Sequence, residues 1–91
     1  MKLNRKPQQM ELDIIENNRI GINLAKLRFM NALTQTRYTE LIQLCGLDID
    51  RATLSLIEHG KRKLLVYEIP FFAKALKMPV GEFTEKILVR E

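Results

Sequence analysis

The amino-acid sequence predicts a single all-α domain, a compact bundle of five helices. Apolar residues recur at roughly helical spacing along most of the chain, and several segments have a capping residue in front and glycine or proline behind. No segment of useful length alternates between polar and apolar residues as a half-buried strand does. Ninety-one residues suffice for one domain with a modest core. We therefore expect one folded unit over residues 10–91, preceded by a flexible basic arm over residues 1–9.

The first helical region covers residues 10–31. Its apolar positions recur at helical spacing: Met10, Ile14, Ile15, Ile20, Leu24, Leu27 and Met30. Asn17 and Asn18 could cap a new helix at Arg19, so one long helix and two shorter ones are both compatible with the pattern.

The second and third helices have clear boundary residues. Thr34 is an N-cap residue in front of a helix over 35–45, with Leu41 and Leu44 as its apolar stripe, and Gly46 ends it. Asp50 caps a short third helix, whose buried pair would be Leu54 and Ile57 and which would end at Gly60.

The last two helices are placed by prolines. Pro70 is tolerated only in a first turn, so the fourth helix should start between Val66 and Ile69; its apolar residues are Phe72, Ala73 and Leu76. Pro79 closes the linker, and Phe83, Ile87 and Leu88 mark a fifth helix.

Composition narrows the function classes. The net charge of +4 and a pI near 9.5 lean toward a polyanionic partner. One cysteine and one histidine exclude an internal disulfide and a multi-thiolate metal site and remove most hydrolytic triads. No apolar run approaches the roughly 18–20 residues that span a bilayer, and the start lacks the apolar segment of a secretory signal. We expect a cytoplasmic protein with no catalysis, cofactor, metal or membrane contact.

Four motifs at characteristic spacings carry a family resemblance: Leu33-Thr34-Gln35, the segment 46–51 (GLDIDR), the segment 54–62 (LSLIEHGKR) and the segment 73–76 (AKAL). Together they resemble the Cro/CI-type phage-repressor helix-turn-helix family, the XRE-like regulators with a lambda-repressor-like fold. The resemblance covers about residues 19–88, with the helix-turn-helix over about 34–60. It implies a sequence-specific regulator, usually of repressor type, that binds double-stranded DNA as a symmetric dimer with its third helix, about 51–59, in the major groove.

The resemblance also implies roles for individual residues. Base-reading positions would be Arg51, Ala52, Ser55 and Leu56. Phosphate contacts would come from Thr34, Gln35, His59, Lys61, Arg62 and Lys63. Arg28 and Glu58 would form a structural ion pair between the first and third helices.

Two features depart from that pattern. Leu56 stands where the family usually has a polar reader, and Ala52 offers only a methyl group, so hydrogen-bonded readout would rest on Arg51 with help from Ser55. Asp48 and Asp50 place negative charge beside the reading surface.

These departures keep alternatives open. The rival interpretation is a protein-interaction module on the same scaffold, such as an antitoxin or an anti-repressor partner, because fold does not determine function. A regulatory protein partner is also compatible with the DNA-binding interpretation. We further expect a homodimer through the region of helices four and five, with Phe83 and Ile87 near its interface, because the apolar residues there exceed what one small core needs.

Overall fold

The computed structural model describes the backbone of residues 7–90 and the side chains of residues 15–90. It contains five α-helices, and the part of the chain that it describes has no strand. They are α1 (Pro7–Met30), α2 (Gln35–Cys45), α3 (Arg51–Glu58), α4 (Ile69–Ala75) and α5 (Val80–Ile87), with a 3₁₀ turn, η1 (Val66–Glu68), leading into α4. The prediction of an all-α bundle is confirmed.

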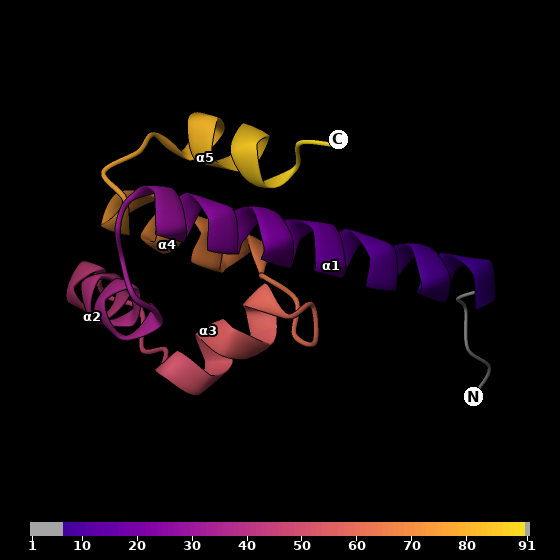
Figure 1. Ribbon diagram of the computed structural model, residues 1–91, viewed down its shortest axis with the longest axis horizontal. Coiled ribbons are helices and arrows are strands. Elements are labelled where there is room, and N and C mark those ends of the chain that lie inside the picture. The colour runs from indigo at the N-terminus through magenta and orange to yellow at the C-terminus, as the bar shows by residue number, and fades with distance from the viewer. Residues whose placement is uncertain (1–6, 91) are drawn as a thin grey trace.

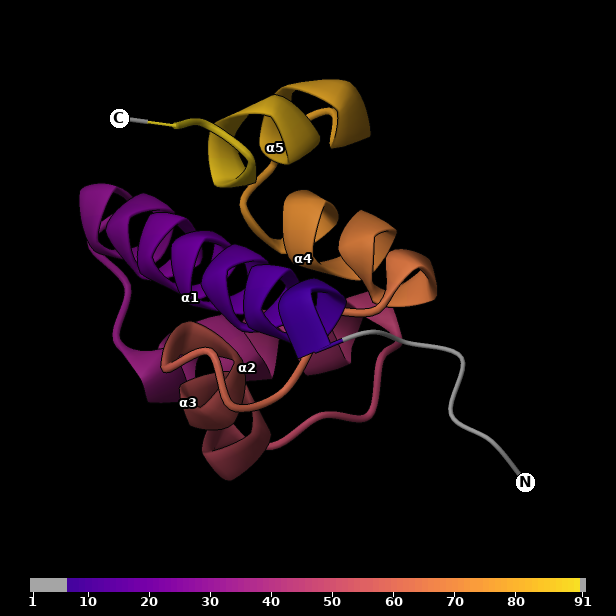
Figure 2. The same ribbon diagram turned by 90° about the vertical axis from the view of Figure 1, so that its right-hand side faces the viewer.

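Helix α1 runs the length of the molecule, and the other helices pack around its C-terminal part (Figure 1). It contacts α3 on one side and α5 on another, while α4 contacts both α2 and α5. Turned by 90°, the molecule shows α2 and α3 below α1, α5 above it and α4 to its right (Figure 2). Within residues 7–90, one long side of α1 therefore has no helix against it. No helix within residues 7–90 has the length and apolar content needed to cross a bilayer.

The core lies where α1, α2, α3, α4 and α5 converge. Its largest fully buried side chains include Leu24, Tyr38, Leu54, Phe72 and Phe83. The ring of Tyr38 meets the ring of Phe72 edge to face at a centroid distance of 5.8 Å, and its hydroxyl donates to the Phe72 carbonyl oxygen over 2.8 Å. Burial, with the nearby negative charge of Glu58, raises the pKa of Tyr38 far above its usual range, so this donor stays protonated.

The first helical region is one helix, not two. It begins at Pro7, which suits a first turn because proline lacks the N–H that would have no partner there. Residues 7–9, expected in the arm, are therefore helical, and residues 1–6 lie outside the described part. Of the expected apolar positions, Leu24 and Leu27 are buried, but Ile15 and Met30 are exposed.

The predicted caps of α2 and α3 are confirmed. The Thr34 side chain accepts from the N–H of Arg37 over 3.0 Å, and Asp50 accepts from the N–H of Thr53 over 2.8 Å. Gly46 adopts φ +115°, a left-handed conformation that costs glycine little, and so ends α2. Helix α3 ends at Glu58, slightly before the expected Gly60, and the fourth helix begins within the expected window.

The expected stripe of α2 is wrong in one position. Leu44 is 79% exposed, and the buried residues are Tyr38, Thr39 and Ile42. Leu44 follows Ile42 by two residues, which is about 200° around a helix of 3.6 residues per turn. It therefore points away from the side of α2 that faces the core.

The expected dimer through helices α4 and α5 stays a prediction, but Phe83 and Ile87 do not themselves form its surface. Their side chains are 0% and 2% exposed, so they belong to the protein's own core. The end of α5 is held against α1 by Asn23, whose side-chain amide donates to the carbonyl oxygens of Ile87 (2.9 Å) and Val89 (3.0 Å). The physical reason is that α5 is a short helix with a strongly one-sided apolar face, and it covers α1 and α4 with that face.

Candidate nucleic-acid interface

Helices α2 and α3 are joined by a short turn over residues 46–50 that is itself anchored to the core. Ile49 is buried, and the Gln43 side chain donates to the Ile49 carbonyl oxygen over 2.7 Å. Helix α3 then packs on both α1 and α2 through Leu54, Ile57 and Glu58. The turn therefore sets the direction in which the free side of α3 faces.

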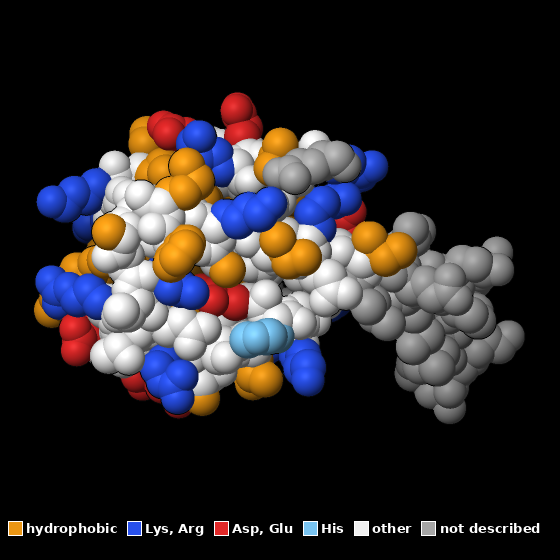
Figure 3. Space-filling view, viewed as in Figure 1, with side chains coloured by type: hydrophobic (Ala, Val, Ile, Leu, Met, Phe, Trp, Pro, Cys, Tyr) orange, Lys and Arg blue, Asp and Glu red, His pale blue; other side chains and the backbone are white. Residues whose placement is uncertain are grey.

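The free side of α3 carries the expected base-reading residues. Arg51, Ala52 and Leu56 are exposed, and Ser55 is half-buried. Leu56 exposes 46% of its surface although it is apolar. Side chains of both charges and the histidine lie over α3 at the lower edge of the molecule (Figure 3). Helix α3 thus has one side in the core and one side that is free to contact another molecule.

A chain of polar contacts links α1 to the start of α3. Arg28 donates twice to Glu58, from Nε to Oε2 over 2.7 Å and from Nη2 to Oε1 over 3.1 Å. The Gln35 amide donates to Glu58 Oε1 over 2.9 Å, and Arg51 Nη1 lies 3.4 Å from Gln35 Oε1. The Glu58 side chain is 4% exposed, so an unpaired charge there would be costly. The expected ion pair between Arg28 and Glu58 is present.

These contacts change the expected role of Gln35. One N–H of its amide already serves Glu58, and its oxygen faces Arg51. Only the second N–H is left for a phosphate oxygen. Thr34 is exposed at the start of α2, but its hydroxyl oxygen already accepts the Arg37 N–H as the helix cap.

Arg62 requires a correction, because the protein itself occupies its guanidinium. It donates to Glu68 over 2.6 Å and 2.9 Å and to the Lys63 carbonyl oxygen over 2.8 Å. Glu68 also accepts the N–H of Leu65 over 2.9 Å. Glu68 raises the pKa of Arg62 through this ion pair. Arg62 thus fastens the loop after α3 to η1, and we leave it out of the phosphate set.

Protonation of the Glu68 carboxylate should lower the free energy of unfolding in acid. Burial by itself raises its pKa, but the hydrogen bonds from Arg62 and Leu65 outweigh burial and lower the pKa below the usual 4.5. A carboxyl whose pKa is lower in the folded state stabilises the fold above its unfolded pKa, and this contribution disappears as the pH falls through the folded pKa. We expect Glu68→Gln to lower the free energy of unfolding by about 1–3 kcal/mol at pH 7. The difference should shrink between pH 4.5 and pH 2.

Urea denaturation of both proteins from pH 7 to pH 2 measures this difference. Glu40→Gln is the matched control, because Glu40 is exposed and its contact with Arg37 is a surface pair. A difference between Glu68→Gln and the natural protein that stays constant over this pH range would contradict the assignment.

The remaining expected phosphate contacts follow α3 in the chain. The Nδ1 atom of His59 lies 2.7 Å from the Ser55 carbonyl oxygen, so a proton on Nδ1 donates to the last turn of α3. Lys61 and Lys63 are exposed. They therefore remain available as cations beside the outward side of α3. Asp48 and Asp50 are exposed near its start, and Thr53 holds the pKa of Asp50 below its usual value.

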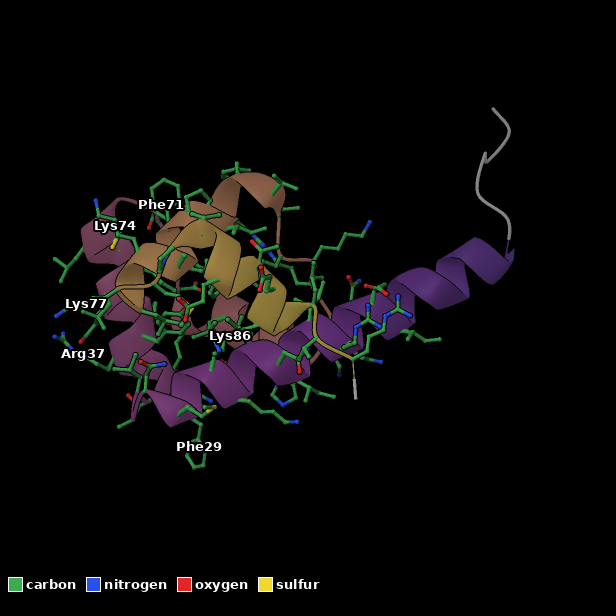
Figure 4. The ribbon with its side chains drawn as sticks, turned by 90° about the horizontal axis from the view of Figure 1, so that it is seen from above. Phe29, Arg37, Phe71, Lys74, Lys77 and Lys86 are labelled. Carbon is green, nitrogen blue, oxygen red and sulfur yellow. The ribbon has the colours of Figure 1, made fainter. Side chains whose placement is uncertain are left out.

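Sequence reasoning did not consider a second basic region. Arg37, Lys74 and Lys77 are exposed and lie along one edge of the bundle, on α2, on α4 and just beyond α4, respectively (Figure 4). A signal was present in the sequence, because Arg37 stands in the first turn of α2, close to Thr34 and Gln35. Arg37 contacts Glu40 over 3.2 Å, with both side chains more than half exposed.

The described residues hold no cluster of three histidine, cysteine, aspartate or glutamate side chains placed to bind a metal ion. Cys45 is half-buried beside the core. Comparison of the chain with known protein families finds no family model that matches it. No curated protein matches it either.

Proposed function

We propose that this protein is a sequence-specific DNA-binding regulator of repressor type, with α3 as the element that enters the major groove. The observation that carries the proposal is that α3 is held from behind while Arg51, Ala52 and Leu56 face solvent. Eight residues of α-helix are about 12 Å long, which suits a groove about 12 Å wide. The proposal involves no catalytic step and no cofactor, and it places the protein in the cytoplasm with its DNA.

Each proposed contact has a distinct chemical role. Arg51 can donate two hydrogen bonds to a guanine edge, Ala52 can meet a thymine methyl group, and Ser55 can donate or accept. Lys61 and Lys63 would contact phosphates and contribute affinity without sequence information. Two copies on a two-fold site would place their α3 helices about one helical turn of DNA apart.

Substitutions on the proposed interface should separate base reading from phosphate binding. We expect Arg51→Ala to cost about 1–3 kcal/mol of discrimination between the preferred site and a random duplex. Lys61→Ala or Lys63→Ala should weaken binding to all sequences alike and reduce the slope of log K against log salt by about 0.9 each. The measurement is titration of labelled duplex at several salt concentrations, after selecting a preferred site from a random library. Glu82→Gln, which changes one exposed charge in the first turn of α5, is the control and should change neither quantity.

The second candidate function is a protein-interaction module on the same scaffold, acting as an antitoxin or anti-repressor partner. The exposed Leu56 favours it, because an apolar side chain on the outward side of α3 suits a protein surface better than a polar base edge. The two candidate functions predict different retention on random duplex DNA at low salt. A chain that is not retained on random duplex DNA, or whose retention does not depend on salt, would support the protein-interaction function and contradict DNA binding.

A further inference from the structure

Helix α1 carries an apolar row on the side that no other helix covers. Ile15, Ile22 and Phe29 are 56%, 52% and 79% exposed. They are seven residues apart, which is the repeat at which helices pair in coiled coils. Met30, Leu88 and Val89, also exposed, extend this α1 row toward α5. Figure 3 shows hydrophobic side chains spread over this side, with Lys and Arg side chains between them.

The surface beside the α1 row is hollowed. A depression of about 400 Å³ lies between α1 and α5, and its apolar lining comes from Leu27, Met30 and Val89. Figure 4 shows Phe29 projecting from α1 away from the rest of the bundle. Charged side chains of Lys26, Glu85 and Lys86 also line the depression, and Phe29 precedes its lining residue Met30 in α1. Exposed apolar side chains rimmed by polar residues are a feature of interaction surfaces.

We infer that the α1 row pairs with the α1 row of a second copy of this chain, with the two helices antiparallel. A two-fold axis near Ile22 places Ile15 of one copy opposite Phe29 of the other, and the reverse, because both lie seven residues from Ile22. Two-fold interfaces require such a self-complementary surface. The α1 row meets that requirement, because the same row on each copy supplies both sides of the interface.

The antiparallel arrangement has a consequence for α3. In Figure 1, α3 lies below α1 and α5 lies above it. Figure 4, seen from above, shows Phe29 of the α1 row pointing toward the side of α1 that faces the viewer in Figure 1. Rotation by 180° about an axis that is vertical in Figure 1 turns the second copy so that its α1 row faces the α1 row of the first copy. The rotation does not change which side of each copy is the lower one. Both α3 helices therefore face the same side of the dimer, whereas parallel α1 helices would place them on opposite sides. A two-fold DNA site needs the first arrangement.

The apolar area of the α1 row suits a weak dimer, because it is smaller than the area of a standard interface. A standard interface covers about 800 Å² per partner, which is about an eighth of the surface of 6366 Å². Full burial of one aliphatic or aromatic side chain contributes about 1.5–3 kcal/mol. At about 25 cal/mol per Å², this equals roughly 60–120 Å² of apolar surface. Six partly exposed side chains thus supply roughly 200–400 Å², and the apolar stems of neighbouring Lys and Arg residues add to this. We expect a dissociation constant in the micromolar range.

Charges beside the row do not supply the attraction. Glu16 pairs with Arg19 within α1 and lies 3.8 Å from Arg90. Pairing through apolar side chains should therefore not weaken when salt is added. This behaviour is opposite to that of DNA binding, so the two properties can be measured separately.

Cross-linking between single cysteines tests the arrangement directly. In a Cys45→Ala background, Ile15→Cys and Phe29→Cys proteins are mixed and treated with a short bismaleimide, which can bridge helices packed about 8–10 Å apart. We expect a cross-linked dimer from the mixture and from Ile22→Cys alone, and little from Ile15→Cys alone. Lys74→Cys, on α4, should remain monomeric. Efficient linking of Ile15→Cys to itself without linking to Phe29→Cys would overturn the antiparallel arrangement.

Sedimentation equilibrium tests the association itself, in the absence of DNA. Ile22→Asp and Phe29→Asp change exposed side chains, so the helical circular dichroism signal should be unchanged while the dissociation constant rises at least tenfold. A natural protein that remains monomeric at several hundred micromolar would overturn the inference and leave the proposed DNA binding untouched. A protein that forms the dimer but does not bind DNA would contradict the proposed DNA binding and leave the dimer inference untouched.

Discussion

Replacing Glu58 by alanine should destabilise the protein by about 3–5 kcal/mol, the largest effect we expect from a single charge removal. The substitution leaves the guanidinium of Arg28, which is 15% exposed, without the carboxylate that accepts its two hydrogen bonds. It also frees Gln35, which contacts both Glu58 and Arg51. The measurement is the free energy of unfolding from urea denaturation at pH 7.

The chain offers a matched control in the exposed pair of Arg37 and Glu40. Glu40→Ala also removes one carboxylate from an ion pair, but both partners remain hydrated, so the expected cost is below about 1 kcal/mol. A double variant, Arg28→Met with Glu58→Leu, should recover much of the lost stability because no charge is then buried alone. Equal effects of Glu58→Ala and Glu40→Ala would contradict the role assigned to the buried pair.

Replacing Gly21 by alanine should have the second largest effect, at least about 2–3 kcal/mol. Gly21 of α1 faces the backbone at the end of α3. A Cβ atom there would lie 2.5 Å from the Glu58 carbonyl oxygen and 2.8 Å from its carbonyl carbon, and it would also meet the Ile57 carbonyl oxygen. These are backbone atoms, so no side-chain rotation relieves the overlap and α3 must move away from α1.

Gly81 is the control for that substitution. It lies in the first turn of α5, and a Cβ atom there would meet nothing within 4 Å. Because alanine favours helix more than glycine does, Gly81→Ala should leave stability unchanged or raise it by up to about 1 kcal/mol. Thermal unfolding of both variants gives the comparison, and a similar loss in both would contradict the close approach at Gly21.

Both sites bear on the proposed function, because both set the position of α3. A variant with Gly21→Ala that still folds should bind DNA more weakly than its remaining folded fraction explains. The same reasoning predicts little effect on DNA binding from Gly81→Ala.

Local sequence was sufficient for the boundaries of α2 and α3. Each capping hydrogen bond, at Thr34 and at Asp50, joins a side-chain oxygen to the backbone N–H three residues later. Such a bond depends only on residues that are close in the sequence. The left-handed turn at Gly46 is equally local. Leu54 and Ile57 were predicted as buried because residues three apart lie on the same side of a short helix, and both are buried.

Prediction failed where several helices competed for the same apolar residues. Phe83 and Ile87 were expected near a dimer interface, and α5 uses them to cover α1 and α4. Leu44 was expected in the core, and it faces away from it. Sequence reasoning counts apolar residues along each helix, but the number that the core can hold depends on how the helices pack.

By itself the sequence determined an all-α chain, the caps of α2 and α3, and the motif residues that favour a DNA-binding regulator. Only the tertiary structure decided which side chains are free to act. Arg62 is taken up by Glu68 and Gln35 partly by Glu58, whereas Arg51 and the α1 row remain exposed. The reason is physical: a helix cap forms between neighbours in the chain, but exposure and ion pairing depend on residues such as Arg28 and Glu58 that meet only after folding.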